Sequence, residues 1–424
     1  MSTNNPLTLV IFGATGNLYA DKLAKSLFLL FEEGNTLPSD FKIIAFARKD
    51  FSNQDFRTYT KDSILKRSET YKIDASKLDD FLTHIEYWQG DFSGVNDFVK
   101  LKNYLSLEKD RSILLHLATT SLLYEKIFKN IKAAGLNTVN ERMSILIEKP
   151  FGKDGADTKH LHAILSNIFA DSEVFHVDHY LAKETTRVIP LFRFKDGSLE
   201  EKWNNKNIEK IKVIFHESNI VGSRGASYDT VGAFRDVGEN HMLELLALTI
   251  MDKPLELHGE AVRKSRAKAL QDLYIDQSCP MTKGQYEGYL SEPGVRADSK
   301  TETFFRVFLK SKNPRFADVE FELEGGKGLI DMHSNITTTT VTVEVYFKNA
   351  KNSSRKEFKI QPVPGTSYDS YIKVYTDAIA LDQTLFVSME EIISEWKLAD
   401  ELLTQWKNIP LVIYKKGSKA EEVF

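Results

Sequence analysis

The stretch that most constrains the fold lies near the amino end, where a short apolar run passes through a glycine turn into a helix. Residues 7–12 (LTLVIF) are apolar and rich in β-branched side chains, as in a strand buried on both faces of a parallel sheet. Gly13 and Gly16 follow, and residues 21–31 have helical apolar spacing. A pyrophosphate can bind backbone N–H groups at such a helix start. By itself, this G-x-x-G turn does not distinguish a dinucleotide site from an ordinary strand-to-helix turn.

Further apolar runs alternate with helical segments through residue 150, which predicts a doubly wound parallel sheet. The runs are residues 41–47 (FKIIAFA), 112–118 (SILLHLA) and 143–147 (MSILI). We therefore predict a Rossmann domain over residues 1–177. Its candidate cofactor loop consists of Gly13, Ala14, Thr15, Gly16, Asn17 and Leu18.

Two basic residues end the second predicted strand and bear on the choice of nucleotide. NAD enzymes usually place a carboxylate there, against the adenine ribose. Here Arg48 and Lys49 occupy the position, and cations suit the 2′-phosphate of NADP. A solvated strand end is the alternative, but the glycine turn upstream makes us favour NADP, with Arg48 as a cofactor-binding residue.

A lysine follows the strand predicted at 143–147. Lys149 precedes Pro150 and stands at a strand's carboxyl end, where open α/β sheets bind their ligands. We expect it to project toward both a nicotinamide and its substrate. The alternative is a proline–glycine turn with a lysine in solvent.

The densest cluster of chemically active side chains is residues 176–184 (HVDHYLAKE), with two imidazoles, a phenol, an ammonium and two carboxylates. Neither a strand period nor a helical stripe explains this composition. A solvated charged turn is one interpretation. The other is an anion-binding site with a carboxylate–histidine relay.

The remaining chain predicts an α+β domain over residues 178–424, built on a large, mainly antiparallel sheet. Residues 303–309 and 338–347 alternate apolar and polar side chains, as strands with one solvated face do. Residues 368–381 and 390–406 have the pattern of amphipathic helices.

Composition narrows the functional classes. A chain of 424 residues exceeds the roughly 250–300 at which single cores stop growing, which favours two domains. The net charge of −4 gives no reason to expect nucleic acid, and no apolar run suggests a membrane span. Cys279 is the single cysteine, so an intramolecular disulfide or cysteine-rich metal site is excluded. We expect a cytoplasmic protein with no metal and with neither a nucleic acid nor a membrane as partner.

Several motifs, in order, resemble the signatures of the glucose-6-phosphate dehydrogenase family. They are GATGNL at 13–18, EKPFG at 148–152, HVDHYLAKE at 176–184 and FRDVGENH at 234–241. The resemblance covers nearly the whole chain. It implies oxidation of D-glucose 6-phosphate at C1 to 6-phospho-D-glucono-1,5-lactone with NADP, the first step of the oxidative pentose phosphate pathway. It also implies a homodimer or homotetramer.

The same resemblance assigns roles to individual residues. His241 would be the base that takes the C1 hydroxyl proton, and Asp178 would orient it. A carboxylate behind an imidazole fixes the tautomer and stabilises the imidazolium. The phosphate would be bound by His179, Tyr180 and Lys183, all of which can donate hydrogen bonds. The sugar hydroxyls would be bound by Lys149, Glu217, Asp236 and Lys327.

Two departures from the family pattern leave rival interpretations open. Ala182 replaces the usual glycine before Lys183, and Met332 stands where many members carry a basic substrate-binding residue. One rival is another Rossmann sugar oxidoreductase with a Glu-Lys-Pro lysine. The other is a non-catalytic regulatory relative. The cluster of His179, Tyr180 and Lys183 favours a phosphorylated substrate.

Overall fold

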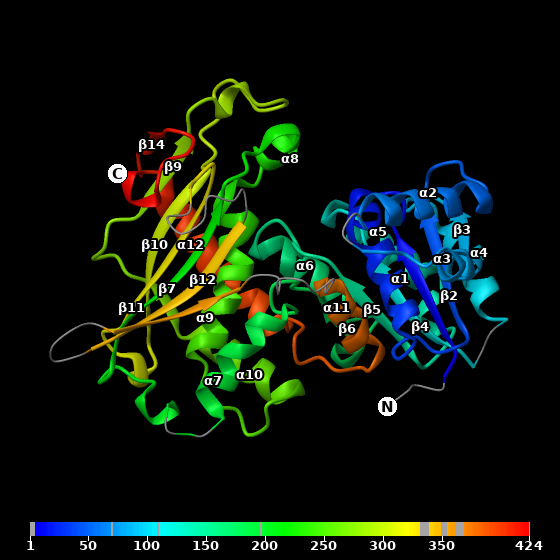
Figure 1. Cartoon of the computed structure of the whole chain (residues 1–424), viewed down its shortest axis with the longest axis horizontal. Helices are drawn as coiled ribbons and strands as arrows, with labels where there is room; N and C mark the ends of the chain where they lie inside the picture. Colours follow the sequence, from blue (N-terminus) through cyan, green and yellow to red (C-terminus); the bar gives the residue numbers. More distant parts are fainter. Residues whose placement is uncertain are drawn as a thin grey trace. The chain divides into compact units, whose positions relative to one another are not determined.

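The computed structural model describes residues 5–68, 71–107, 110–195, 197, 199–330, 339–348, 354–360 and 369–423. The chain forms two compact units (Figure 1). The first comprises Met1–Ala182 and Gly365–Met389, and the second comprises Lys183–Pro364 and Glu390–Phe424. The sequence suggested a boundary after residue 177 and placed residues 365–389 in the second domain. That segment lies in the first unit instead, because its helix packs there.

The first unit is built on a six-stranded, fully parallel sheet in the order β3-β2-β1-β4-β5-β6. Its strands are β1 (Leu7–Phe12), β2 (Phe41–Ala47), β3 (Ile85–Gln89), β4 (Ser112–Leu117), β5 (Met143–Ile147) and β6 (Val174–His176). The predicted doubly wound parallel sheet is confirmed. The strand order reverses between β1 and β4, and such a switch point is where this fold binds ligands.

Both faces of β1 are covered, which accounts for its unbroken apolar sequence. Leu9 and Ile11 belong to a core cluster with the first helix, while Phe12 stacks on Phe98 with ring centroids 5.7 Å apart. The helices of this unit are α1 (Ala24–Glu33), α2 (Asn53–Lys66), α3 (Ala75–Thr83), α4 (Val95–Leu105), α5 (Tyr124–Ala134), α6 (Gly155–Leu165) and α11 (Ser370–Ile379). In Figure 1, α11 is orange, yet it lies among elements from the beginning of the chain.

The second unit contains an eight-stranded mixed sheet in the order β13-β12-β7-β11-β10-β9-β14, with β8 paired to β10. Its strands are β7 (Ile208–Glu217), β8 (Leu273–Ile275), β9 (Thr282–Tyr286), β10 (Phe304–Ser311), β11 (Glu320–Lys327), β12 (Thr339–Phe347), β13 (Ser354–Lys359) and β14 (Leu411–Tyr414). The large, mainly antiparallel sheet is confirmed, and it contains two parallel pairs, β7 with β11 and β9 with β14.

The helices of the second unit are α7 (Val188–Phe194), α8 (Gly225–Tyr228), α9 (Leu243–Ile250), α10 (Gly259–Gln271) and α12 (Met389–Trp406). A π-helix, Phe234–Met242, runs directly into α9. We call residues 234–250 the site helix. This helical segment therefore begins with a wider turn than that of an α-helix. In the described part of the chain, no helix has the length and apolar character needed to cross a bilayer.

Candidate active site

The glycine turn after β1 packs closely against the residue that follows β4. Gly13 has a φ of 92°, and a Cβ at this position would lie 2.5 Å from the Ala118 carbonyl oxygen. No side chain fits there, so glycine is required. Gly16 N donates to Gly13 O at 2.9 Å and closes the turn. Leu18 then leads into a π-helix, Tyr19–Leu23, before α1 begins.

The basic end of β2 lies at the same sheet edge as this turn. Gly13 N donates to Phe46 O at 2.9 Å, which ties the turn to the penultimate residue of β2. Arg48 and Lys49 follow immediately and are exposed. A glycine cradle at the switch point with an exposed cation beside it has the chemistry that a phosphorylated dinucleotide needs. The residues present therefore fit this cofactor.

Lys149 and Asp178, from two separate sequence motifs, form an ion pair in the first unit. Lys149 Nζ lies 3.3 Å from Asp178 Oδ2, and both side chains are largely shielded from solvent. Asp178 Oδ1 accepts hydrogen bonds from Tyr180 N at 2.8 Å and from Leu181 N at 3.3 Å. The carboxylate therefore organises its own turn while it holds the lysine. Orientation of His241 by Asp178 stays a prediction.

The residues expected to bind phosphate continue from this turn. The His179 ring centroid lies 4.8 Å from that of Tyr180 and 6.5 Å from that of Tyr371, whose plane it matches within 13°. Lys183 is the first residue of the second unit. Among the described residues, positive φ values outside glycine occur at Asp318 and Leu381, so Ala182 needs no left-handed backbone. Met332 lies outside the described residues.

A buried hydrogen-bond network behind Lys149 was not predicted from the sequence. Glu148 Oε1 lies 2.9 Å from His116 Nε2, and Glu148 Oε2 accepts from Tyr371 Oη at 3.0 Å. His116 Nδ1 lies 2.8 Å from Tyr375 Oη. Burial, together with the nearby charge of Glu148, raises the pKa of Tyr371 and of Tyr375, so both phenols stay protonated donors. The sequence offers one signal for this network: Glu148 follows a buried strand, and a buried carboxylate requires hydrogen-bond donors.

In the second unit, three residues expected to bind sugar hydroxyls come together. Lys327 Nζ forms an ion pair with Glu217 and lies 3.1 Å from Asp236 Oδ2. Lys327 and Glu217 are direct partners in the parallel pairing of β11 with β7. Lys327 is buried and also lies over the Tyr228 ring, 5.3 Å from its centroid. The result is a compact group of two carboxylates around one ammonium.

The π-helical start of the site helix determines where Asp236 and His241 lie. In a π-helix each amide bonds the carbonyl five residues earlier, so Asp236 and His241 are one turn apart along the same side. An α-helix would separate them around the axis. The His241 ring lies 6.4 Å from the Phe215 ring of β7 at an interplanar angle of 17°. Asn240 Oδ1 accepts from His241 N at 2.6 Å.

Within the described residues, no group of three histidine, cysteine, aspartate or glutamate side chains is arranged to hold a metal ion. The predicted residues are divided between the two units. In the first unit they are the glycine loop, Arg48, Lys149, Asp178, His179 and Tyr180, and in the second Lys183, Glu217, Asp236, His241 and Lys327. Their residue types suit the removal of a proton and the binding of polyol and phosphate groups.

Comparison with known proteins identifies the relatives of this chain. Residues 10–187 match the family described as "Glucose-6-phosphate dehydrogenase, NAD binding domain", and residues 190–365 match its C-terminal domain. A glucose-6-phosphate 1-dehydrogenase of Borreliella burgdorferi is 30% identical, over 97% of this chain and 94% of the relative. A cytoplasmic glucose-6-phosphate 1-dehydrogenase of Arabidopsis thaliana is 28% identical, over 97% and 89%. A solved structure of glucose-6-phosphate dehydrogenase in complex with its substrate glucose 6-phosphate has a TM-score of 0.88 at 27% identity, covering 99% of this chain and 96% of that one.

Proposed function

We infer that this chain, which belongs to the glucose-6-phosphate dehydrogenase family, oxidises D-glucose 6-phosphate at C1 to 6-phospho-D-glucono-1,5-lactone with NADP as hydride acceptor. The observation that carries this inference is the group formed by Lys327, Glu217 and Asp236 on the sheet of the second unit. Such paired charges bind several sugar hydroxyls at once, because each hydroxyl can both donate and accept a hydrogen bond.

We assign the proton transfer to His241. When the hydride leaves C1, the proton of the C1 hydroxyl must leave as well for the lactone carbonyl to form. A histidine suits this transfer because its unperturbed pKa of about 6.5 lies near neutral pH. Asp236, one π-helical turn away, would bind a neighbouring hydroxyl and so hold the reacting carbon against His241. Asp178 is proposed to orient His241.

The phosphate is assigned to His179, Tyr180 and Lys183. An imidazole, a phenol and an ammonium can all donate to phosphate oxygens, and the charge of Lys183 strengthens its hydrogen bond to the phosphate. Tyr180 is anchored through its backbone N–H to Asp178, which supports a fixed position for this group. Lys149, paired with the same Asp178, is proposed to bind the sugar and to face the nicotinamide.

NADP, when bound, supplies the hydride acceptor. Gly13, Ala14, Thr15, Gly16, Asn17 and Leu18 would form the loop that surrounds its pyrophosphate, and Arg48 would bind its 2′-phosphate. The position of this turn at the switch point between β1 and β4 supports this assignment.

We further propose that the protein is cytoplasmic, as one relative's name states for that relative. We propose that it acts as a homodimer or homotetramer in the first step of the oxidative pentose phosphate pathway. Sedimentation of the purified protein would test the assembly, and a monomer at enzymatic concentrations would refute it.

A single assay tests the activity. We expect NADPH to form from glucose 6-phosphate, much more slowly from free glucose, and more slowly again when NAD replaces NADP. An absence of reduced nucleotide with every pair would refute the enzymatic function and favour a regulatory relative. Equal rates with glucose and its phosphate would refute the assignment of His179, Tyr180 and Lys183 and favour another sugar oxidoreductase.

A further inference from the structure

The amino end of the site helix is capped by a buried carboxylate from another element. Phe234 N donates to Glu302 Oε1 at 3.0 Å, and Ala233 N donates to Glu302 O, also at 3.0 Å. Glu302 is buried and lies just before β10. The first amides of a helix have no partner within it, so they need an acceptor from another element. Glu302 supplies that acceptor.

The backbone before the site helix is shaped around this carboxylate. Gly232 has a φ of 80°, and a Cβ there would lie 2.6 Å from Glu302 Oε2. Any side chain at this position would therefore push the carboxylate away from Phe234. The absence of a side chain at Gly232 thus leaves the space that the Glu302 carboxyl group occupies.

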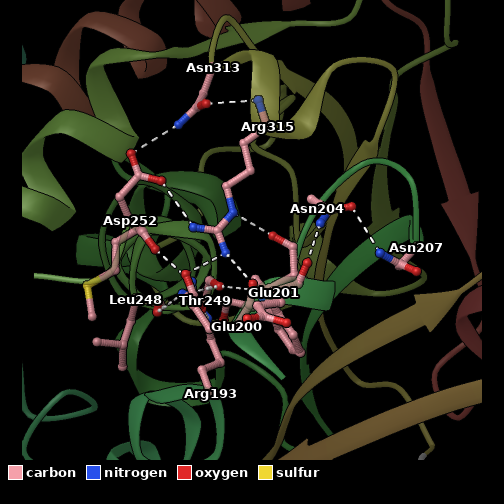
Figure 2. Close-up of polar contacts among 12 residues, drawn as sticks. Arg193, Glu200, Glu201, Asn204, Asn207, Leu248, Thr249, Asp252, Asn313 and Arg315 are labelled. Atoms are coloured by element: carbon pink, nitrogen blue, oxygen red, sulfur yellow. Dashed lines mark hydrogen bonds and ion pairs between the residues drawn. The ribbon is translucent and has the colours of Figure 1, made fainter. Parts of the chain in front are cut away.

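The carboxyl end of the same helix is capped by a cation (Figure 2). Arg193 of α7 donates from Nη1 to Thr249 O at 2.7 Å and from Nη2 to Met251 O at 2.8 Å. Its Nη2 also lies 2.9 Å from Glu200 Oε2, which balances the buried cation. A positive group is favoured at this end of a helix. The site helix is thus fixed at both ends by side chains from separate elements.

We propose that Glu302 is a positioning residue for the active site, because it fixes the rotation and axial position of the turn that carries Asp236 and His241. This inference rests on the proposed function of those two residues. Asp236 lies two residues after the capped Phe234, and its carboxylate must meet Lys327 Nζ at 3.1 Å. π-Helical turns are rare in proteins, so such a turn depends on support from outside the helix.

The decisive variant is Glu302→Asp, which keeps the carboxyl group but withdraws it from Phe234 by one methylene. We expect kcat/KM for glucose 6-phosphate to fall by about tenfold or more, since small displacements of positioning groups cost this much. The KM for NADP should stay within about twofold, because the cofactor residues belong to the other unit. Glu302→Gln keeps an acceptor oxygen at the original distance and should restore most of the activity.

Amide hydrogen exchange gives a second measurement that does not depend on activity. Peptides from residues 234–242 should exchange faster in Glu302→Asp than in the wild type. The matched control is Glu322→Asp, a buried glutamate of β11 paired with Lys212 at 3.1 Å, which should leave these peptides and the kinetics unchanged. Should Glu302→Asp fail to fold, Gly232→Ala displaces the same carboxylate and should show the same pattern.

The positioning role would be overturned if folded Glu302→Asp showed wild-type amide exchange at residues 234–242 and wild-type kinetics. A rise in the KM for NADP as large as the fall in kcat/KM for glucose 6-phosphate would also overturn it, because a general weakening of the fold would then explain the data. If the wild type itself fails to oxidise glucose 6-phosphate, the proposed function fails. The exchange measurement then still decides whether Glu302 holds the helix.

Discussion

Tyr371 Oη donates a hydrogen bond of 3.0 Å to Glu148 Oε2, and so joins a helix from the last quarter of the chain to the residue that precedes Lys149. The same carboxylate lies 2.9 Å from His116 Nε2. This buried contact explains why α11 belongs to the first unit. It also restrains Lys149, the next residue in the chain, because Glu148 cannot shift without breaking hydrogen bonds in an environment that excludes water.

Tyr371→Phe should therefore weaken both the fold and the site. Removal of the phenol leaves a buried carboxylate oxygen short of a donor, which costs about 1–3 kcal/mol of unfolding free energy. We expect kcat/KM to fall by about tenfold as Lys149 loses its fixed position. Thermal unfolding and steady-state kinetics of the purified variant measure the two effects.

The control for this variant is Tyr104→Phe, because Tyr104 also donates to a glutamate, Glu86 Oε2, at 2.7 Å. That bond belongs to the first unit but involves none of the proposed site residues. Its loss should leave kcat/KM unchanged. If Tyr371→Phe is destabilised yet keeps wild-type kinetics, the network serves the fold alone.

His241→Asn tests the proposed base. Asparagine preserves polarity and approximate size but cannot take up the C1 hydroxyl proton, so kcat should fall by about 10²–10⁴-fold with little change in KM. The exposed His258 offers the matched substitution, His258→Asn, which should have no effect. A kcat near the wild-type value in His241→Asn would assign the proton transfer to another group.

The extent to which the sequence predicts this site depends on whether each feature is local. The glycine turn can be predicted from the sequence because β1 supplies a continuous apolar run and Gly13 follows it directly. The pairing of Lys327 with Glu217 cannot be predicted, since it depends on the register between β11 and β7, which are far apart in the sequence. Without the resemblance to a family, neither residue would have been selected.

Two other features also depend on tertiary contacts. The amphipathic pattern of α11 predicts a helix but does not say which sheet it packs against. The hydrogen bond from Tyr371 to Glu148 cannot be predicted from the sequence either. The π-helical turn is equally hard to predict, because the contact of its first amide with Glu302 joins residues far apart in the sequence. These are the features that propensity and periodicity cannot specify.

Arg48→Ala tests the choice of cofactor. Loss of a charge-assisted contact to the 2′-phosphate, worth about 1.5–3 kcal/mol, should raise the KM for NADP by about tenfold or more. NAD lacks this phosphate, so its kinetics should stay close to those of the wild type. Lys66→Ala removes another exposed cation of the same unit and serves as the control. An equal change for NAD and NADP would refute binding of the 2′-phosphate by Arg48.

Glu302 should also make stability depend on pH. Burial raises the pKa of this carboxyl to about 7 from an unfolded value near 4.5, against the lowering effects of the Phe234 amide, Arg235 and Lys283. Between these values the unfolded chain ionises while the folded chain retains its proton, so ionisation favours unfolding as the pH rises. The wild type should lose about 3 kcal/mol relative to Glu302→Gln across this window, and nothing further above it.

Urea unfolding of both proteins at pH 5 and pH 8 measures this difference. Asp229→Asn is the control: although burial opposes it, hydrogen bonds from Ser299, Arg296 and Tyr289 lower the pKa of Asp229 to about 2. Asp229 is therefore ionised in both states across the whole range, and its substitution should shift stability equally at both pH values. A difference between wild type and Glu302→Gln that does not grow with pH would mean that Glu302 is already ionised in the folded protein at pH 5. The cap of the site helix would then carry a permanent charge.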